Sequence, residues 1–157
     1  MRVIAIDPGT TESAILYWDG ETITRKEILT NTKVLRVLRG TIYTPDVRLA
    51  IEMVASYGMA VGKTVFETVF WIGKFHEACQ SIPEERKALI YRMDVKMHHC
   101  KSARAKDSNI RQALIDRFGP PGVKKAPGLT YGIKKDLWSA FAIATYYYDT
   151  HKDETAM

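Results

Sequence analysis

The stretch that most constrains this chain lies near its start, where four apolar residues lead directly into an aspartate and a tight turn. The run Val3-Ile4-Ala5-Ile6 is mostly β-branched, and Asp7-Pro8-Gly9 follows it at once. A short apolar run of this kind predicts a strand buried on both faces, which Pro-Gly then ends in a turn. Asp7 is therefore expected at the mouth of a central strand. A carboxylate there is costly unless a metal ion or a basic side chain meets it, although an Asp that bonds its own turn explains Asp7 alone equally well.

The next residues predict a meander. Two β-rich runs, over 13–19 and 22–29, are joined by an Asp-Gly pair, which is a strong hairpin signal. A short helix over 31–40 is expected after them, with Asn31 or Thr32 as its cap. The chain thus opens as three antiparallel strands followed by a helix.

A second acid, Glu52, is also expected at the carboxyl end of a buried strand. Residues 47–52 predict another core strand, and its carboxyl end carries Glu52. If the two strands are neighbours in one sheet, the two acids lie close together, and like charges at that distance favour a cation between them. A Glu52 that turns out to solvent is the alternative.

A loop and a strongly apolar helix follow. The loop over 53–62 comes after a strand end, where α/β folds bind ligands, and its Tyr57 is a candidate to stack on a base or to fill a core gap. The expected helix over 63–80 has a wide apolar stripe that includes Phe66 and Phe70. Such a stripe favours one face on the sheet and a second on another copy, although full burial in a monomer explains it equally well.

The following segment is basic. A strand is expected over 88–95, and 96–101 then places two His and one Cys among lysines. Adjacent residues cannot converge on one tetrahedral zinc ion, so phosphate contact is the better interpretation. A helix capped by Asp107 or Ser108 is expected to run to Phe118.

The last motif joins a lysine-rich loop to a helix. Residues 119–135 contain four Gly, three Pro and four Lys, which predicts a loop that presents cations. Asp136 then begins an apolar helix. An acid at a helix N-terminus is favoured by the dipole without any chemistry, but three acids in matched contexts suggest a site.

Charge and composition restrict the class of protein. Residues 86–135 contain 13 Lys and Arg against 3 Asp, a net +10, so the remainder carries −5 of the overall +5. A basic block of this size indicates nucleic-acid binding, with a solvated basic face as the alternative. No apolar run is long enough to span a membrane, and Cys79 and Cys100 are expected to be free thiols in a reducing cytosol.

Together these motifs resemble those of RuvC-like Holliday-junction resolvases, which belong to the RNase H-like superfamily, over nearly the whole chain. Residues 4–9 are similar to the first family motif, 49–52 with the following 71–75 to the second, and 136–144 to the third. The family usually places two acids, or a His and an acid, three residues apart in the third motif. The second of these is Ser139 here, which shares a helix face with Asp136 but brings no charge. The family's aromatic residue after Glu52 is also altered, with Ala55 near its place and Tyr57 two residues later.

The resemblance implies an α/β, RNase H-like fold in which a three-stranded antiparallel meander and parallel strands form one mixed sheet with helices on both faces. It implies a single nuclease domain over 1–157, a Mg²⁺-dependent endodeoxyribonuclease that resolves Holliday junctions and related branched DNA. Asp7, Glu52 and Asp136 would be catalytic and, with Ser139, would hold two Mg²⁺ ions, for which Mn²⁺ substitutes. The enzyme would act as a homodimer through 63–80, in the cytosol of a bacterium or a phage-infected host. The residues expected to contact DNA are Tyr57, Lys96, Lys101, Arg104, Lys106, Arg111, Lys124, Lys125, Lys134 and Lys135.

Two other functions stay open from the sequence. A non-catalytic, structure-specific DNA-binding module on the same fold is favoured by the uncharged Ser139. The motif over 7–11 followed by a hairpin also resembles the phosphate loop of actin-like and Hsp70-like ATPases, but those proteins need two lobes to enclose a nucleotide, and 157 residues supply one.

Overall fold

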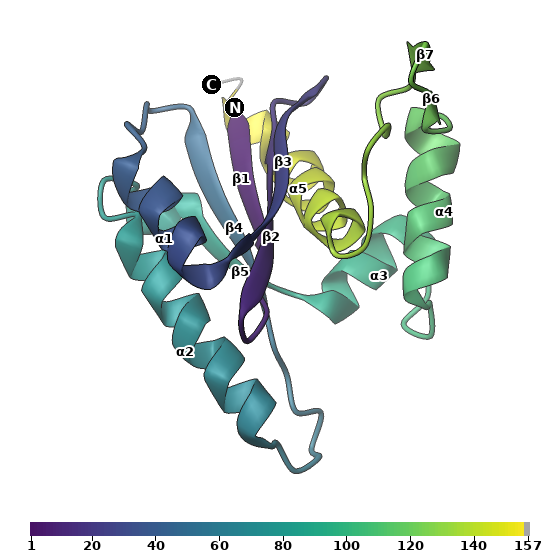
Figure 1. The fold of residues 1–157 in the computed structure, drawn as a ribbon. Coiled ribbons are helices and arrows are strands. Elements are labelled where there is room, and N and C mark those ends of the chain that lie inside the picture. The colour runs from purple at the N-terminus through teal and green to yellow at the C-terminus, as the bar shows by residue number, and fades with distance from the viewer. Residues whose placement is uncertain (156–157) are drawn as a thin grey trace.

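The computed structural model describes residues 1–155 and contains the expected mixed sheet (Figure 1). Strands β1 (Arg2–Asp7), β2 (Glu12–Trp18) and β3 (Ile23–Thr30) form the antiparallel meander. Strands β4 (Val47–Met53) and β5 (Lys87–Tyr91) add in parallel on the other side of β1. The strand order is β3-β2-β1-β4-β5, so β1 lies at the centre.

The central strand is buried on both faces, as its sequence predicts. Its four apolar residues, Val3 to Ile6, are at most 3% exposed. Ile6 pairs with Ile51 of the parallel strand β4, so the residues that follow them, Asp7 and Glu52, emerge at the same edge of the sheet. The register of two buried strands therefore brings the two acids together.

Helices cover both faces of the sheet, and Figure 1 shows them on its two sides. On one side lie α1 (Asn31–Gly40) and α2 (Lys63–Ala78). On the other lie α3 (Arg92–Cys100), α4 (Asp107–Phe118) and α5 (Leu137–His151). Short 3₁₀ turns occupy Glu84–Arg86 and Lys152–Thr155.

Alternation along β1 divides the core into two layers. Val3 and Ala5 face α5, while Ile4 and Ile6 face α1 and α2. On the α5 side Phe141 is fully buried and meets Trp18 edge-on, with ring centroids 5.2 Å apart. Truncation of such a side chain to alanine costs about 3–5 kcal/mol, so α5 is fixed firmly against the sheet. Both ends of α5 are thereby positioned.

The strand expected over 88–95 is wrong in its second half. β5 ends at Tyr91, which pairs with the last residue of β4, Met53, and Arg92 begins α3. Because no partner strand extends further, the ladder stops there, and Val95 is buried by the helical continuation instead. Pairing in the sheet therefore sets the end of β5, and the strand propensity of the sequence could not predict that end.

Other boundaries differ less. The helix expected over 63–80 ends at Ala78, and the expected cap of α1 is wrong because Thr30 is the N-cap and no side chain caps it. The lysine-rich loop contains a two-stranded hairpin, β6 (Gly122–Val123) with β7 (Ala126–Pro127). Among the described helices, none combines the length and apolar character that crossing a bilayer requires.

Candidate active site

Four acids line one cavity of about 250 Å³, and three of them are the acids that the sequence motifs singled out. Asp7 ends β1, Glu52 lies near the end of β4, and Asp136 precedes the first residue of α5. Ser139, one turn into α5, lines the same cavity. The structure therefore brings together the four residues that the sequence analysis grouped.

A buried polar triangle fixes the turn after Asp7. The Asn31 amide donates to the Gly9 carbonyl at 2.9 Å, the Ser13 hydroxyl donates to Asn31 Oδ1 at 2.6 Å, and the Gly9 amide donates to Ser13 Oγ at 3.1 Å. A Cβ at Gly9 would lie 2.3 Å from the Glu12 carbonyl oxygen, so only glycine fits this turn. Asn31 or Thr32 was expected only as a helix cap, so this role of Asn31 was not predicted.

The backbone before α5 is held in an unusual conformation. Lys135 has φ +49°, in the left-handed region, which costs a residue with a Cβ roughly 1 kcal/mol. Asp136 follows it, and its carbonyl accepts the first helical hydrogen bond, from the Ala140 amide at 3.0 Å. The Asp136 side chain makes no capping bond, so capping does not account for this acid.

Burial and like charge perturb Asp7 strongly. The pKa of its carboxyl group is raised to about 9. Burial is the largest cause, and the negative charge of Glu52, hydrogen bonding to Glu52 and the negative charge of Asp136 add to it. The nearby Arg92 guanidinium opposes this rise in pKa but does not cancel it. Asp7, Glu52 and Asp136 therefore crowd one another electrostatically, and a further cation among them would relieve this.

Two residues of this cavity were missed by the sequence analysis. Arg92 donates from Nη1 to Glu52 Oε1 at 3.1 Å, and its Nη2 pairs with Asp107 Oδ1. Arg92 follows β5 directly, and the signal that could have found it was its place at the end of a third parallel strand. The strand expected over 88–95 ran past it. Asp107 or Ser108 was expected to cap α4, but the N-cap is Lys106.

The donor set fits Mg²⁺ or Mn²⁺ in its chemistry. Carboxylate oxygens are the hard ligands that these ions take, and a bound cation would offset the like charges that help to raise the pKa of Asp7. Within residues 1–155, however, no three His, Cys, Asp or Glu residues are grouped closely enough to hold an ion as they stand. Glu52 is instead paired with Arg92.

A second cavity of about 410 Å³ adjoins the first and is partly basic. It shares Glu52 and Asp136 with the acidic cavity and adds Arg111 and Lys135. The Arg111 guanidinium lies over the Trp138 ring, 5.1 Å from its centroid, which orients it on the cavity wall. Two of the expected DNA contacts thus lie beside the acids.

The other expected DNA contacts are more dispersed. Tyr57 is 62% exposed in the loop after β4. Lys124 and Lys125 occupy the turn of the β6–β7 hairpin, which Figure 1 shows beyond the end of α4 that is remote from Asp107. Four of the remaining residues are exposed around the ends of α3, α4 and α5: Lys101, Arg104, Lys106 and Lys134. The fifth, Lys96, lies within α3 and is half-buried.

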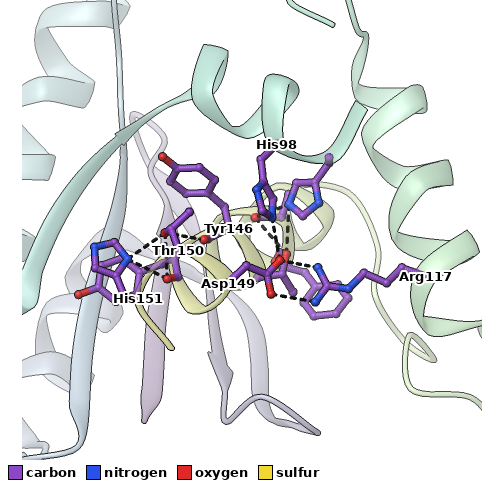
Figure 2. A network of polar contacts seen from close by, with 11 residues as sticks. His98, Arg117, Tyr146, Asp149, Thr150 and His151 are labelled. Carbon is purple, nitrogen blue, oxygen red and sulfur yellow. Dashed lines mark hydrogen bonds and ion pairs between the residues drawn. The ribbon is translucent and has the colours of Figure 1, made fainter. Parts of the chain in front are cut away.

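Both histidines of α3 contact α5, and His98 belongs to a network at the C-terminal end of that helix (Figure 2). His98 Nε2 donates to Asp149 Oδ2 at 2.7 Å, and Arg117 binds both oxygens of Asp149, at 2.5 and 2.8 Å. His99 Nε2 donates to the Ala142 carbonyl at 2.9 Å. These contacts join α3, α4 and α5.

The fold matches solved structures of RuvC. The chain superposes on "T. thermophilus RuvC in complex with Holliday junction substrate" with a TM-score of 0.71 and 18% identity, over 99% of this chain and 97% of that one. A second Thermus thermophilus RuvC structure gives 0.67 and 19%, over 97% of both chains. No protein-family model and no curated protein matches the sequence. The chain therefore has the RuvC-type, RNase H-like fold.

Proposed function

We propose that this protein is a divalent-metal-dependent endonuclease that cleaves Holliday junctions and related branched DNA, with residues 1–157 as one nuclease domain. The observation that carries the proposal is the convergence of Asp7, Glu52 and Asp136 on one cavity at the carboxyl edge of a RuvC-type sheet. The raised pKa of Asp7 supports it, because buried groups with strongly perturbed pKa values cluster at functional sites.

The residues divide into two tasks. Asp7, Glu52 and Asp136 would hold two Mg²⁺ ions, with the Ser139 hydroxyl beside them. When bound, two such ions activate water and stabilise the leaving oxygen of an in-line displacement at phosphorus. Arg111 and Lys135 line the adjoining cavity, where they would hold the backbone phosphate and orient it toward the acids.

A substrate panel tests the proposal. Four-way junctions, flaps, forks and linear duplex are incubated with Mg²⁺, Mn²⁺ or EDTA, and the products are separated on denaturing gels. We expect metal-dependent cleavage of the branched substrates, abolished in Asp7→Asn and Glu52→Gln, whereas both variants still bind the junction because other groups hold the DNA. Tight junction binding without cleavage in either metal would identify a non-catalytic DNA-binding module instead.

The basic block supports DNA binding by counterion release. Lys101, Arg104 and Lys106 lie exposed around the connection from α3 to α4. Replacement of any one by Gln is expected to lower the slope of log affinity against log salt by about one unit. Titrations at several salt concentrations measure this slope. Lys33→Gln on α1, outside the basic block, is the matched control, and an unchanged slope in all three variants would place the DNA on another surface.

The outer side of α2 supports a homodimer. Phe66 and Phe70 are 65% and 63% exposed there, and Val69 beside them is 37% exposed. A second copy would bury these side chains across a two-fold axis and place two sites on one junction.

Light scattering tests the dimer. Phe66→Lys and Phe70→Glu are expected to give folded monomers that nick a junction without paired incision. Ile42→Lys alters an apolar residue that is 91% exposed outside α2, so this control should stay dimeric. A wild-type protein that stays monomeric with junction DNA present would refute the assembly.

A further inference from the structure

Arg92 occupies the third position at the edge of the sheet where Asp7 and Glu52 occupy the first two. The parallel strands β1, β4 and β5 end side by side, and Met53 at the end of β4 pairs with Tyr91 just before Arg92. Two strands therefore deliver an acid and the third delivers a cation. Arg92 is the only basic residue among those that line the acidic cavity within the described chain.

The guanidinium joins two carboxylates that belong to different elements. Its Nη1 lies 3.1 Å from Glu52 Oε1, and its Nη2 pairs with Asp107 at the start of α4. The Glu52 side chain is 13% exposed, whereas that of Asp107 is 78% exposed. One partner is thus inside the site and the other at its rim. A planar fork of donors can hold both carboxylates at once, which an ammonium group cannot do with the same geometry.

The charge of the cavity explains why a cation lies here. Asp7, Glu52, Asp107 and Asp136 line it, so their mutual repulsion would oppose folding without a counter-charge. Arg92 supplies one positive charge, but its hydrogen bond occupies Glu52 Oε1, and its charge repels a divalent ion that approaches the same carboxylate. The same contact that stabilises the ion-free site therefore competes with metal binding.

We propose that Arg92 is a displaceable counter-cation: it holds Glu52 while no divalent ion is bound, and it leaves Glu52 but keeps Asp107 when an ion binds. This inference rests on the proposed function. Asp107 acts in it as the anchor that retains the guanidinium at the rim of the cavity. The displaced group then lies toward the basic cavity that Arg92 also lines, next to Arg111 and Lys135.

Metal binding without DNA tests the inference directly. Isothermal titration of Mn²⁺ into the full-length protein is compared for the wild type, Arg92→Gln and Arg92→Lys. Removal of the competing charge is expected to tighten Mn²⁺ binding by roughly tenfold in Arg92→Gln, with a smaller change in Arg92→Lys. The ion-free Arg92→Gln protein is also expected to melt at a lower temperature, so that added Mn²⁺ raises its melting temperature more than that of the wild type.

Arg111→Gln is the matched control. It removes the same charge from the adjoining cavity without a contact to Glu52, so Mn²⁺ affinity should change much less than in Arg92→Gln. A double-mutant cycle tests the anchor, because Asp107→Asn should have no further effect on Mn²⁺ affinity once Arg92 is Gln. A similar loss of affinity from Asp107→Asn in both backgrounds would instead make Asp107 a metal ligand and overturn its role as anchor.

The outcomes separate this inference from the proposed function. Unchanged or weaker Mn²⁺ binding in a folded Arg92→Gln protein overturns the inference, while metal-dependent cleavage by the wild type leaves the nuclease standing. If Arg92→Gln fails to fold, Arg92→Lys decides the matter by the same titration. Failure of all these proteins to bind Mn²⁺, with no cleavage by the wild type, overturns both proposals.

Discussion

The charged clusters at the two ends of α5 differ in how fully their carboxylates are paired with cations. At the C-terminal end, Asp149 accepts hydrogen bonds from Arg117 and His98, and although burial alone would raise its pKa, these partners lower it. Near the N-terminal end, Asp136 lies beside Asp7, whose pKa is raised by burial and by its acidic neighbours. One cluster is balanced by its own cations and the other is not.

The pairing of charges distinguishes a structural cluster from a functional one more clearly than residue type does. The network that includes Asp149 has histidines, a carboxylate and an arginine, a set that suggests chemistry. Its donors and acceptors, however, bond to one another and to the α5 backbone, so they hold α3, α4 and α5 together. The acidic cavity has one arginine among four carboxylates. A site that keeps unbalanced charge is able to recruit a ligand, whereas a balanced one only stabilises the fold.

The largest expected effect contrasts the two aspartates of α5 in catalysis. Asp136→Asn should lower junction cleavage by about a thousandfold, roughly 4 kcal/mol of transition-state stabilisation, because it removes a charge that holds the metal ions. Asp149→Asn makes the same chemical change at the other end of the helix and should leave the rate within a few-fold. Single-turnover cleavage assays measure the rates of both variants, and an equal loss of rate in the two would contradict the proposed difference between the clusters.

A smaller effect concerns the stability of the metal-free protein. The folded pKa of Asp7 is raised, to about 9 from 3.8, so its contribution to stability is full below pH 3.8 and is lost as the pH rises through that window. Asp7→Asn has no proton to lose and should be the more stable protein at pH 8, by about 3 kcal/mol. Urea unfolding in EDTA at pH 5 and pH 8 measures this. The exposed Asp116→Asn on α4 should follow the wild type, and a destabilised Asp7→Asn at pH 8 would contradict the raised pKa.

The smallest effect belongs to the balanced cluster and has the opposite sign. Asp149→Asn should destabilise the protein by about 1–2 kcal/mol at pH 7, since it weakens the charge-assisted bonds from Arg117 and His98. The folded pKa of Asp149 is lowered, so this contribution is present above pH 3.8 and is lost as the pH falls through the folded pKa. The difference in unfolding free energy between wild type and variant should therefore shrink below pH 3.8. A constant difference at all pH values would mean that Asp149 acts through shape alone.

Local sequence determined the strands and most helices of this protein. The apolar run before Asp7 requires burial on both faces, and the Asp-Gly pair requires a hairpin. Helical periodicity sets α2 and α4 to within two residues of the expected bounds, and it sets the start of α5 to within one residue. Because the two acidic motifs end predicted core strands, the sequence also predicted that Asp7 and Glu52 lie close together if those strands are neighbours, and the parallel pairing of β1 and β4 meets that condition.

Tertiary structure alone decided the partners of Arg92 and Asn31. Arg92 was hidden in an expected strand, and only the end of the β4–β5 ladder turns it toward Glu52. Asn31 had the residue type and position of a helix cap, but the fold brings it to Ser13 and Gly9, 18 and 22 residues away along the chain. The physical reason is the same in both cases: hydrogen-bonding capacity is a property of the residue, whereas its partner is set by packing between segments that are distant in sequence.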